Sequence, residues 1–205
     1  MERKAGKVGK GCSHLVVAKY AAAGGKFSYS DARILARLVQ ADISVEQETD
    51  VEFYADNVLA ESESGVFAGG ILKLIVDGLF DETRRYIEGV PEPQEVTYGE
   101  IKVQETRYTA NAQPPYVAVG LVLMGKSGAN VFEPVILPKV KFKPGGLSAK
   151  TKEKTVSYQT QDLEAAIHRG DDADGTWKIS LGDFDKEAEA IAALDAVLGL
   201  TAANG

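Results

Sequence analysis

Apolar and polar residues alternate with a period of two along much of the chain, which predicts strands rather than helices. The alternating segments are rich in β-branched and aromatic residues and are separated by turn residues such as glycine, proline and aspartate. Strands are expected over residues 13–20, 34–39, 43–54, 67–76, 98–108, 116–124, 131–142, 155–168 and 176–181. Residues 116–124 are apolar on both faces, and this predicts a strand that other elements cover on both sides.

Helical signals are confined to two segments. A short helix is expected near residues 81–88, where Asp81 can cap its start and Gly89 can end it. Apolar residues at helical spacing predict a second, C-terminal helix near residues 185–198, and Gly199 follows it as a stop. Eight or so strands with two helices indicate a mainly β, α+β fold, an antiparallel β-sandwich or barrel that carries its helices on the outside.

The chain of 205 residues has an ordinary globular composition, which predicts a single domain over residues 1–205. Its first twelve residues hold three glycines and four basic side chains against one acidic one, so a flexible N-terminal arm is expected over 1–12. A stretch rich in glycine and lysine predicts a basic loop over 143–154.

The net charge of −7 and the hydropathy of the chain bear on its partners. Proteins that grip nucleic acid usually carry a basic stripe, because neutralisation of phosphates drives that binding, and this chain is acidic. The longest apolar stretch falls far short of the roughly 18 residues of a membrane-spanning helix. The N-terminus lacks the apolar region of a secretory signal, so synthesis and retention in a cytoplasm are expected.

One segment matches a catalytic motif: residues 120–127 (GLVLMGKS) fit the phosphate-loop pattern G-x-x-x-x-G-K-[ST]. A phosphate loop must join a strand to a helix, so that backbone N–H groups at the helix start point toward the phosphates. Here the four intervening residues are apolar and strand-like, and another expected strand follows. A hairpin turn over 125–130 is therefore favoured, and a nucleotide-dependent enzyme is the least favoured function.

The remaining candidate groups are too few or too scattered for a catalytic or metal site. Cys12 is the single cysteine and lies near His14, but no third group completes a catalytic set. His168 is far from both in the sequence. A run of three aspartates over 171–174 lacks the glutamate that a calcium loop requires, so a polar turn is favoured there. We therefore expect no catalytic residue, no cofactor, no metal ligand and no enzymatic activity.

The most informative pattern is the alternation over residues 43–54. Apolar residues share one parity, and four carboxylates share the other: Glu46, Glu48, Asp50 and Glu52. If this segment is one strand, the four carboxylates line one face of it. A solvated outer face is the ordinary interpretation. A surface past which DNA slides would also use this pattern, because carboxylates repel phosphates, so these residues are candidates for the lining of a lumen.

Six lysines fall within sixteen residues further along the chain. Three share a strand face and three lie in the loop that follows: Lys139, Lys141, Lys143, Lys150, Lys152 and Lys154. Nucleic-acid binding is one interpretation, but Phe142 is the single ring of the segment and no aromatic interleaving supports base stacking. A contact with the acidic surface of another copy of the chain is preferred.

Six segments spread over most of the chain share their order and spacing with a known family. They are residues 11–20 (GCSHLVVAKY), 53–61 (FYADNVLAE), 70–79 (GILKLIVDGL), 135–142 (VILPKVKF), 156–160 (VSYQT) and 175–178 (GTWK). Together they resemble the major tail proteins, or tail tube proteins, of phages with long non-contractile tails. The tyrosine-alanine-aspartate segment is the most specific match. The chain departs from the family pattern at Gln161, where a proline is common.

The resemblance implies a sandwich or barrel of tail-tube type, six copies of which form a ring. Rings stack into a hollow tube through which the genome leaves the capsid. The resemblance also implies a location in the virion, contacts with the tape measure protein and other tail proteins, passage of DNA without specific binding, and no membrane partner. The arm over 1–12 or the loop over 145–154 is then a candidate for ring stacking. A tail completion protein, or the tube of a phage-derived secretion or bacteriocin particle, is the alternative.

Overall fold

The computed structural model describes residues 6–47, 51–55, 58–63, 66–146 and 160–201. Within these residues the elements are β1 (Val8–Ala23), β2 (Lys26–Ala36), β3 (Leu38–Gln47), β4 (Val51–Ala55), β5 (Val58–Glu63), β6 (Phe67–Val76), α1 (Asp81–Glu88), β7 (Gln94–Tyr98), β8 (Ile101–Glu105), β9 (Tyr116–Ser127), β10 (Ala129–Phe142), β11 (Gln161–His168), β12 (Ile179–Ser180) and α2 (Glu187–Leu198). The mainly β, α+β class expected from the sequence is confirmed.

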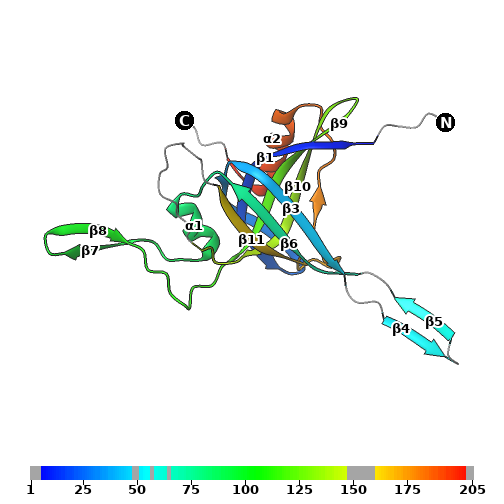
Figure 1. The fold of residues 1–205 in the computed structure, drawn as a ribbon, viewed down its shortest axis with the longest axis horizontal. Helices are drawn as coiled ribbons and strands as arrows, with labels where there is room; N and C mark the ends of the chain where they lie inside the picture. The colour runs from blue at the N-terminus through cyan, green and yellow to red at the C-terminus, as the bar shows by residue number, and fades with distance from the viewer. Residues whose placement is uncertain (1–5, 48–50, 56–57, 64–65, 147–159, 202–205) are drawn as a thin grey trace, which may run out of the picture.

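One antiparallel sheet of eight strands forms the body of the molecule (Figure 1). Its strand order is β2-β1-β9-β10-β11-β6-β3, and β12 pairs with β10. The strands at the two ends of this order, β2 and β3, are joined by the single residue Arg37, so the ends of the sheet meet at that corner. Asp77 fixes the corner, because its carboxylate accepts hydrogen bonds from Arg37 N at 3.2 Å and from Arg37 Nε at 2.5 Å. The sheet curls on itself but does not close into a barrel.

The inner side of the curled sheet encloses the main core. Its buried side chains come from β1, β2, β6, β9, β10 and β11, and half-buried residues of β3 pack against them: Leu15, Val17, Leu35, Leu72, Leu74, Val117, Val119, Leu137, Val140, Leu163 and Ile167, with Leu38, Ala41 and Ile43 of β3. Ile87 of α1 joins this core and is 1% exposed. Burial of each large aliphatic side chain contributes about 1.5–3 kcal/mol, so this shared interior is what holds the curled shape.

A second, smaller core lies on the outer side of the sheet under α2. Ala190, Leu194 and Leu198 of α2 pack on residues of β1, β9 and β10, among them Val16, Ala118, Val122 and Ile136. The prediction that residues 116–124 form a strand covered on both sides is thus confirmed for Val117 to Val122, all of which are buried. Neither of the two described helices is long and apolar enough to cross a membrane.

Several element boundaries differ from the sequence expectation. Asp81 is the first residue of α1 rather than its cap, and Phe80 occupies the cap position without a side-chain hydrogen bond. The C-terminal helix begins at Glu187, two residues later than expected. Residues 34–39 are divided between β2 and β3 because the chain turns at Arg37. Residues 98–108 do not form one strand, because the chain reverses between β7 and β8.

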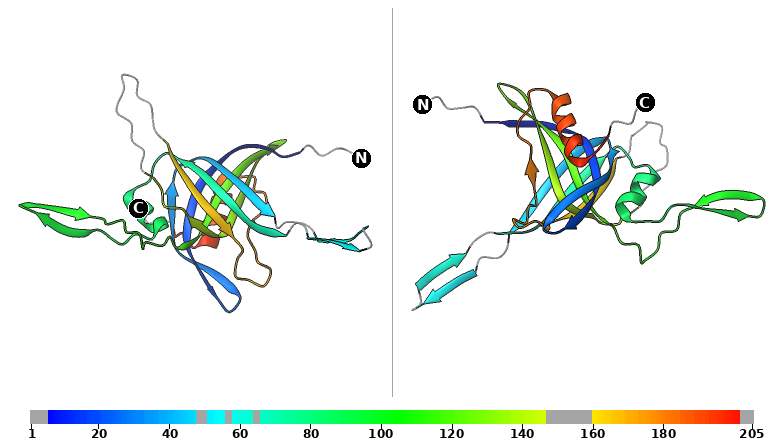
Figure 2. Two further views of the ribbon diagram at one scale, coloured as in Figure 1. Left: turned by 60° about the horizontal axis from the view of Figure 1, so that its bottom comes forward. Right: turned by 180° about the vertical axis from the view of Figure 1, so that it is seen from behind.

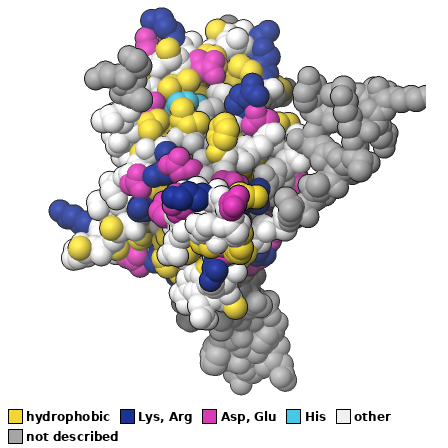
Figure 3. All heavy atoms as spheres, turned by 90° about the vertical axis from the view of Figure 1, so that its left-hand side faces the viewer, with side chains coloured by type: hydrophobic (Ala, Val, Ile, Leu, Met, Phe, Trp, Pro, Cys, Tyr) yellow, Lys and Arg dark blue, Asp and Glu magenta, His cyan; other side chains and the backbone are white. Residues whose placement is uncertain are grey.

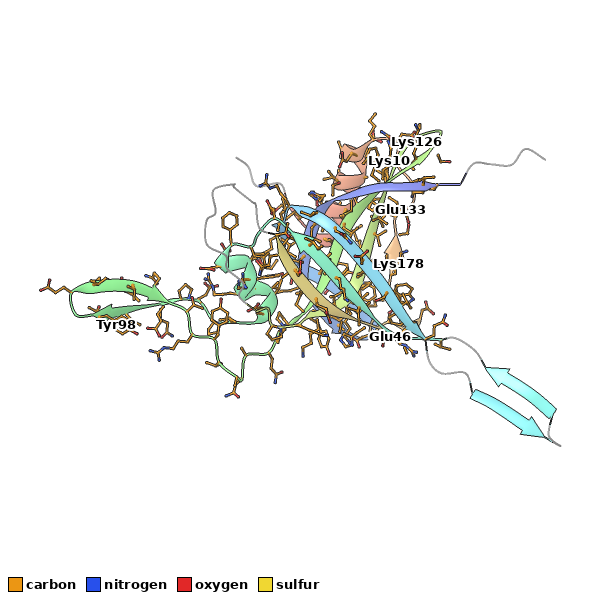
Figure 4. The ribbon with its side chains drawn as sticks, viewed as in Figure 1. Lys10, Glu46, Tyr98, Lys126, Glu133 and Lys178 are labelled. Atoms are coloured by element: carbon orange, nitrogen blue, oxygen red, sulfur yellow. The ribbon has the colours of Figure 1, made fainter. Side chains whose placement is uncertain are left out.

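The flexible arm expected over 1–12 is wrong for residues 8–12, which form the start of β1 and pair with β9. Figure 4 shows Lys10 and Lys126 near each other at this end of the sheet. Lys7 Nζ lies 2.6 Å from Glu133 Oε2 and 2.5 Å from Asp183 Oδ1. Burial by itself would lower the pKa of Lys7, but its hydrogen bonds to the two carboxylates raise that pKa above its ordinary value. This end of the chain is therefore anchored from Lys7 onward.

Candidate assembly surfaces

One half of the outer side of the sheet carries no helix. The helix α2 packs on β1, β9 and β10, whereas neither described helix lies across β11, β6 and β3 (Figure 1). We call this outer surface of β11, β6 and β3 the helix-free face. Half-buried Ile71 and Ile75 of β6 lie on this face among outward-pointing polar side chains: Asp42, Ser44, Glu46, Lys73, Asp162 and Glu164.

Charges of alternating sign cross the helix-free face in a row. Lys73 of β6 lies directly opposite Glu164 of β11 on one side and Asp42 of β3 on the other. Lys143, just beyond β10, forms an ion pair with Glu164 and donates its backbone N–H to the Glu164 carbonyl at 2.8 Å. The hydrogen bond from Lys143 lowers the pKa of Glu164 below its ordinary value. Because cross-strand pairs of opposite charge stabilise a sheet, this row holds four neighbouring side chains in register.

Of the four carboxylates predicted to share one strand, the two that lie in described strands, Glu46 and Glu52, belong to different sheets. Glu46 is an exposed residue of β3 on the helix-free face, near the end of the strand (Figure 4). Glu52 lies in β4, which pairs with β5 in a separate two-stranded sheet. Glu48 and Asp50 lie outside the described residues. The single strand expected over 43–54 is thus replaced by parts of two strands, and the placement of Glu46 in a lumen stays a prediction.

The basic segment is described only in its first half. Lys139 and Lys141 belong to β10 and Lys143 follows it, whereas Lys150, Lys152 and Lys154 lie outside the described residues. Lys139 Nζ is 2.8 Å from Asp171 Oδ2, and Lys143 is paired with Glu164. Two of the three described lysines are therefore neutralised within the chain, because acidic side chains of the neighbouring segments lie next to them.

Lys141 makes a different contact. Its ammonium group lies 5.4 Å from the centre of the Tyr116 ring, and Lys139 lies 4.9 Å from the same ring. His168 approaches this ring edge-on, with 5.4 Å between the ring centroids. The side chains of Lys139, Lys141 and His168 therefore all lie next to the Tyr116 ring, the two lysines by cation–π contacts and the histidine by an edge contact. The proposed role of the basic segment in contacts between copies stays a prediction.

Two hairpins project from the body in different directions (Figures 1 and 2). β4 and β5 pair with each other, and β7 and β8 do the same, apart from the main sheet. The β7–β8 turn has Gly99 at its first central position with φ 65°, which is typical of a type II′ hairpin. On this hairpin Tyr98, Ile101 and Val103 are 58%, 67% and 36% exposed. Figure 4 shows Tyr98 well away from the sheet.

A surface cavity of about 440 Å³ lies where α1 meets the β1–β2 hairpin. The Arg33 guanidinium lies 4.1 Å from the centre of the Tyr86 ring, and burial raises the pKa of Tyr86 to about 12. Asp31 forms an ion pair with Lys19 at 2.8 Å and another with Arg33 at 2.8 Å. The hydrogen bonds from these two side chains hold the pKa of Asp31 below its ordinary value. The charged side chains that line the cavity thus pair with one another. Arg33 of β2 also contacts Tyr86 and Glu82 of α1, and these contacts hold α1 against the sheet.

The phosphate-loop match at residues 120–127 lies inside β9. The predicted strand and hairpin are confirmed, but the turn is shorter than the expected 125–130: β9 continues to Ser127, Gly128 with φ 80° makes the turn, and β10 begins at Ala129. The aspartate run likewise forms a polar turn, in which Asp172 accepts hydrogen bonds from Thr176 N at 2.8 Å and Thr176 Oγ1 at 2.5 Å. In the described part of the chain, no three His, Cys, Asp or Glu side chains converge as metal ligands would.

The cysteine and the first histidine make structural contacts. Cys12 is half-buried against the main core, and burial raises the pKa of its thiol. His14 Nε2 lies 2.7 Å from Asp195 Oδ1, which links β1 to α2. His14 itself has φ 52°, in the left-handed region, where a non-glycine residue is uncommon. Both residues therefore serve to position β1 against its neighbours.

No protein-family model matches the chain, and no curated protein matches it. Support for a function therefore comes from the residues, from their arrangement and from the resemblance between the six sequence segments and tail tube proteins.

Tyr98, Ile101 and Val103 were not among the surface residues predicted from the sequence. The sequence does contain a signal for them. Gly99 and Glu100 separate two short runs, QEVTY and IKVQE, and the order of polar and apolar residues in the second run is the reverse of that in the first. A two-residue turn with glycine first, between alternating runs, is typical of a hairpin. The mirror symmetry places the apolar residues of both runs on the same face.

Proposed function

We propose that this chain is the structural subunit of a phage tail tube. Six copies would form a ring, and rings would stack into a conduit for the genome. The resemblance of the six segments to tail tube proteins supports this function. The mainly β fold with one flanking helix on the sheet is compatible with it, although the fold alone is shared by many functions.

The observation that carries the proposal is the pair of hairpins that leave the main sheet. A two-stranded hairpin is at best marginally stable in water when nothing packs on it. A chain that extends two such hairpins from a well-packed body is suited to reach other copies of itself. Head-to-tail contacts of this kind generate rings when the rotation closes and stacks when it does not.

The helix-free face is the proposed lining of the conduit. It carries Glu46 and the alternating row of Asp42, Lys73, Glu164 and Lys143. On such a face each lysine of the row has a carboxylate beside it, so phosphates of a passing DNA would find little net attraction. DNA would then pass without being held. In this proposal the chain acts in the virion after synthesis in the host cytoplasm, meets the tape measure protein and other tail proteins, and carries out no catalysis.

Electron microscopy of the purified full-length chain in negative stain, over a range of protein concentrations, tests the proposal. Rings and hollow tubes of uniform width are the expected result. Rings that never stack would instead favour a tail completion protein, which is present as one ring in each particle. A chain that stays monomeric at every concentration, with or without DNA and salt, contradicts the proposal.

A further inference from the structure

Helix α1 presents its side chains to different parts of the molecule in stripes, because residues four apart lie on the same face of a helix. The first stripe, Thr83 and Ile87, is buried, and Ile87 belongs to the main core. The second stripe, Glu82 and Tyr86, faces β2, where Arg33 contacts both side chains. These two stripes attach α1 to the body of the molecule.

The third stripe of α1, Arg84 and Glu88, contacts the two chain segments that flank residues 147–159. Glu88 Oε1 accepts a hydrogen bond from the backbone N–H of Gly145 at 3.0 Å. Arg84 Nη2 donates a hydrogen bond to Gln161 Oε1 at 3.1 Å. One face of the helix thus holds the chain at two places, just after β10 ends and at the first residue of β11.

The contact between Glu88 and Gly145 is specific to these two residues. Glu88 is 6% exposed, and glutamate side chains are almost never buried without a partner. A Cβ on Gly145 would lie 3.3 Å from Glu88 Oε1, which is tighter than nine in ten real Cβ contacts. The glycine therefore lets the backbone approach the helix closely enough for its N–H to reach the buried carboxylate.

The described pairing between β10 and β11 ends before Gly145. The register of the two strands extends to Phe142 opposite Ala165, and the Lys143 N–H donates to the Glu164 carbonyl at 2.8 Å. Beyond Lys143, the contact described for the backbone N–H of Gly145 is the one with α1. The helix therefore takes over from the sheet in holding this part of the chain.

We propose that α1 is a positioning element for the chain on both sides of residues 147–159, and that Arg84 and Glu88 are its positioning residues. Because the core and β2 fix α1, the helix transmits a fixed position to Gly145 and Gln161. The consequence for assembly rests on the proposed function, since the basic loop over 143–154 is the predicted stacking contact. Loss of the third stripe then impairs the stacking of rings while the sheet stays folded.

Amide hydrogen exchange of the full chain, followed by NMR, tests the contact at Gly145. Glu88→Ala removes the acceptor and is expected to speed exchange of the Gly145 amide by about tenfold. Glu88→Gln is the matched variant, because its side-chain oxygen can accept the same hydrogen bond, and it is expected to restore slow exchange. Equal exchange at Gly145 in the wild type and in Glu88→Ala overturns the proposal.

Arg84→Ala tests the second contact at a half-buried position, where the variant is expected to fold with an unchanged melting temperature. Arg85→Ala is its control, because Arg85 pairs with Glu92 instead. Charges of both signs are interspersed on the side of the molecule shown in Figure 3, and the two substitutions change the net charge of α1 equally. Shorter tubes in negative stain are expected for Arg84→Ala but not for Arg85→Ala, and equal tube lengths for the two variants overturn the proposal.

A combination with the loop deletion distinguishes positioning from a general loss of stability. Glu88→Ala and Arg84→Ala are expected to shorten tubes no more than deletion of residues 146–152 does. In chains that already lack residues 146–152, the same substitutions are expected to cause no further loss, because the helix acts through those residues. A further loss of the same size in that background overturns the proposal. If Glu88→Ala does not fold, Arg84→Ala decides the result.

The outcomes separate this inference from the proposed function. Normal tubes from the wild type, together with unchanged exchange at Gly145 in Glu88→Ala, overturn the positioning role and leave the tube function standing. A wild-type chain that forms neither rings nor tubes, but whose Gly145 amide depends on Glu88, supports the positioning role and contradicts the tube function.

Discussion

Gly120 of β9 leaves the space that Leu194 of α2 fills. A Cβ placed on Gly120 would lie 2.8 Å from Leu194 Cδ1 and 2.6 Å from Leu198 Cδ1. Real Cβ atoms essentially never show such distances, so an added methyl group forces the ends of these two buried leucine side chains, or the helix that carries them, to shift. The first glycine of the segment that matches the phosphate-loop pattern thus has a packing role, and it accounts for how closely α2 approaches the sheet.

Gly120→Ala is therefore expected to lower the free energy of unfolding by about 1–3 kcal/mol, as overpacking of a well-filled interior does. Urea denaturation followed by circular dichroism measures it. Gly69→Ala is the matched control, because a Cβ there would meet the Ile167 carbonyl oxygen at 3.7 Å, an ordinary contact. Equal effects of the two substitutions would show that the packing under α2 is not the cause.

The stability of the chain is expected to fall as the pH is lowered from about 7.5 to 5.5. Burial lowers the pKa of His168 below its ordinary 6.5, and the nearby Lys139 and Lys141 lower it further. As the pH falls through that range, the unfolded chain takes up more of a proton at His168 than the folded chain does, so the free energy of unfolding decreases. His168→Gln removes this group, and its urea midpoint should change less with pH than that of the wild type. Parallel curves for the two proteins would be inconsistent with this assignment.

The helix-free face is expected to line the lumen of an assembled tube. In a Cys12→Ser background, Glu46→Cys should react with a small maleimide but not with one coupled to a large polymer that cannot enter the tube. Val197→Cys on α2 is the control, because Val197 is 44% exposed on the helix and should react with both reagents. Reaction of residue 46 with the large reagent in intact tubes would place β3 on the outside.

The basic loop is expected to contribute to the stacking of rings. Deletion of residues 146–152 should leave rings but reduce the length and yield of tubes seen in negative stain. Substitution of Lys150, Lys152 and Lys154 by glutamine separates charge from loop length, and should reproduce the defect if electrostatic attraction between copies is the cause. Tubes formed at normal yield by the deletion variant would rule out this role.

Local patterns predicted much of the fold, because they depend on residues that are close in the sequence. The strand over Phe67–Val76 matches its prediction at both ends, and Gly89 ends α1 in the left-handed region as expected. The hairpin after β9 was also predicted, because two strand-like apolar segments lie on either side of a short segment that contains glycine. In contrast, the bend at Arg37 carries no local signal, because Asp77 fixes it from forty positions further along the chain.

The sequence by itself determined the class of the fold, the burial of both faces of the strand over residues 116–124 and the absence of a helix after the phosphate-loop match. Those follow from periodicity and turn chemistry, which act over a few residues. Only the tertiary structure decided which charges meet. It set Lys73 between Glu164 and Asp42, paired Lys139 with Asp171, and placed Glu46 and Glu52 in different sheets. Strand register and sheet membership depend on packing between distant segments, and alternation within one segment contains no information about them.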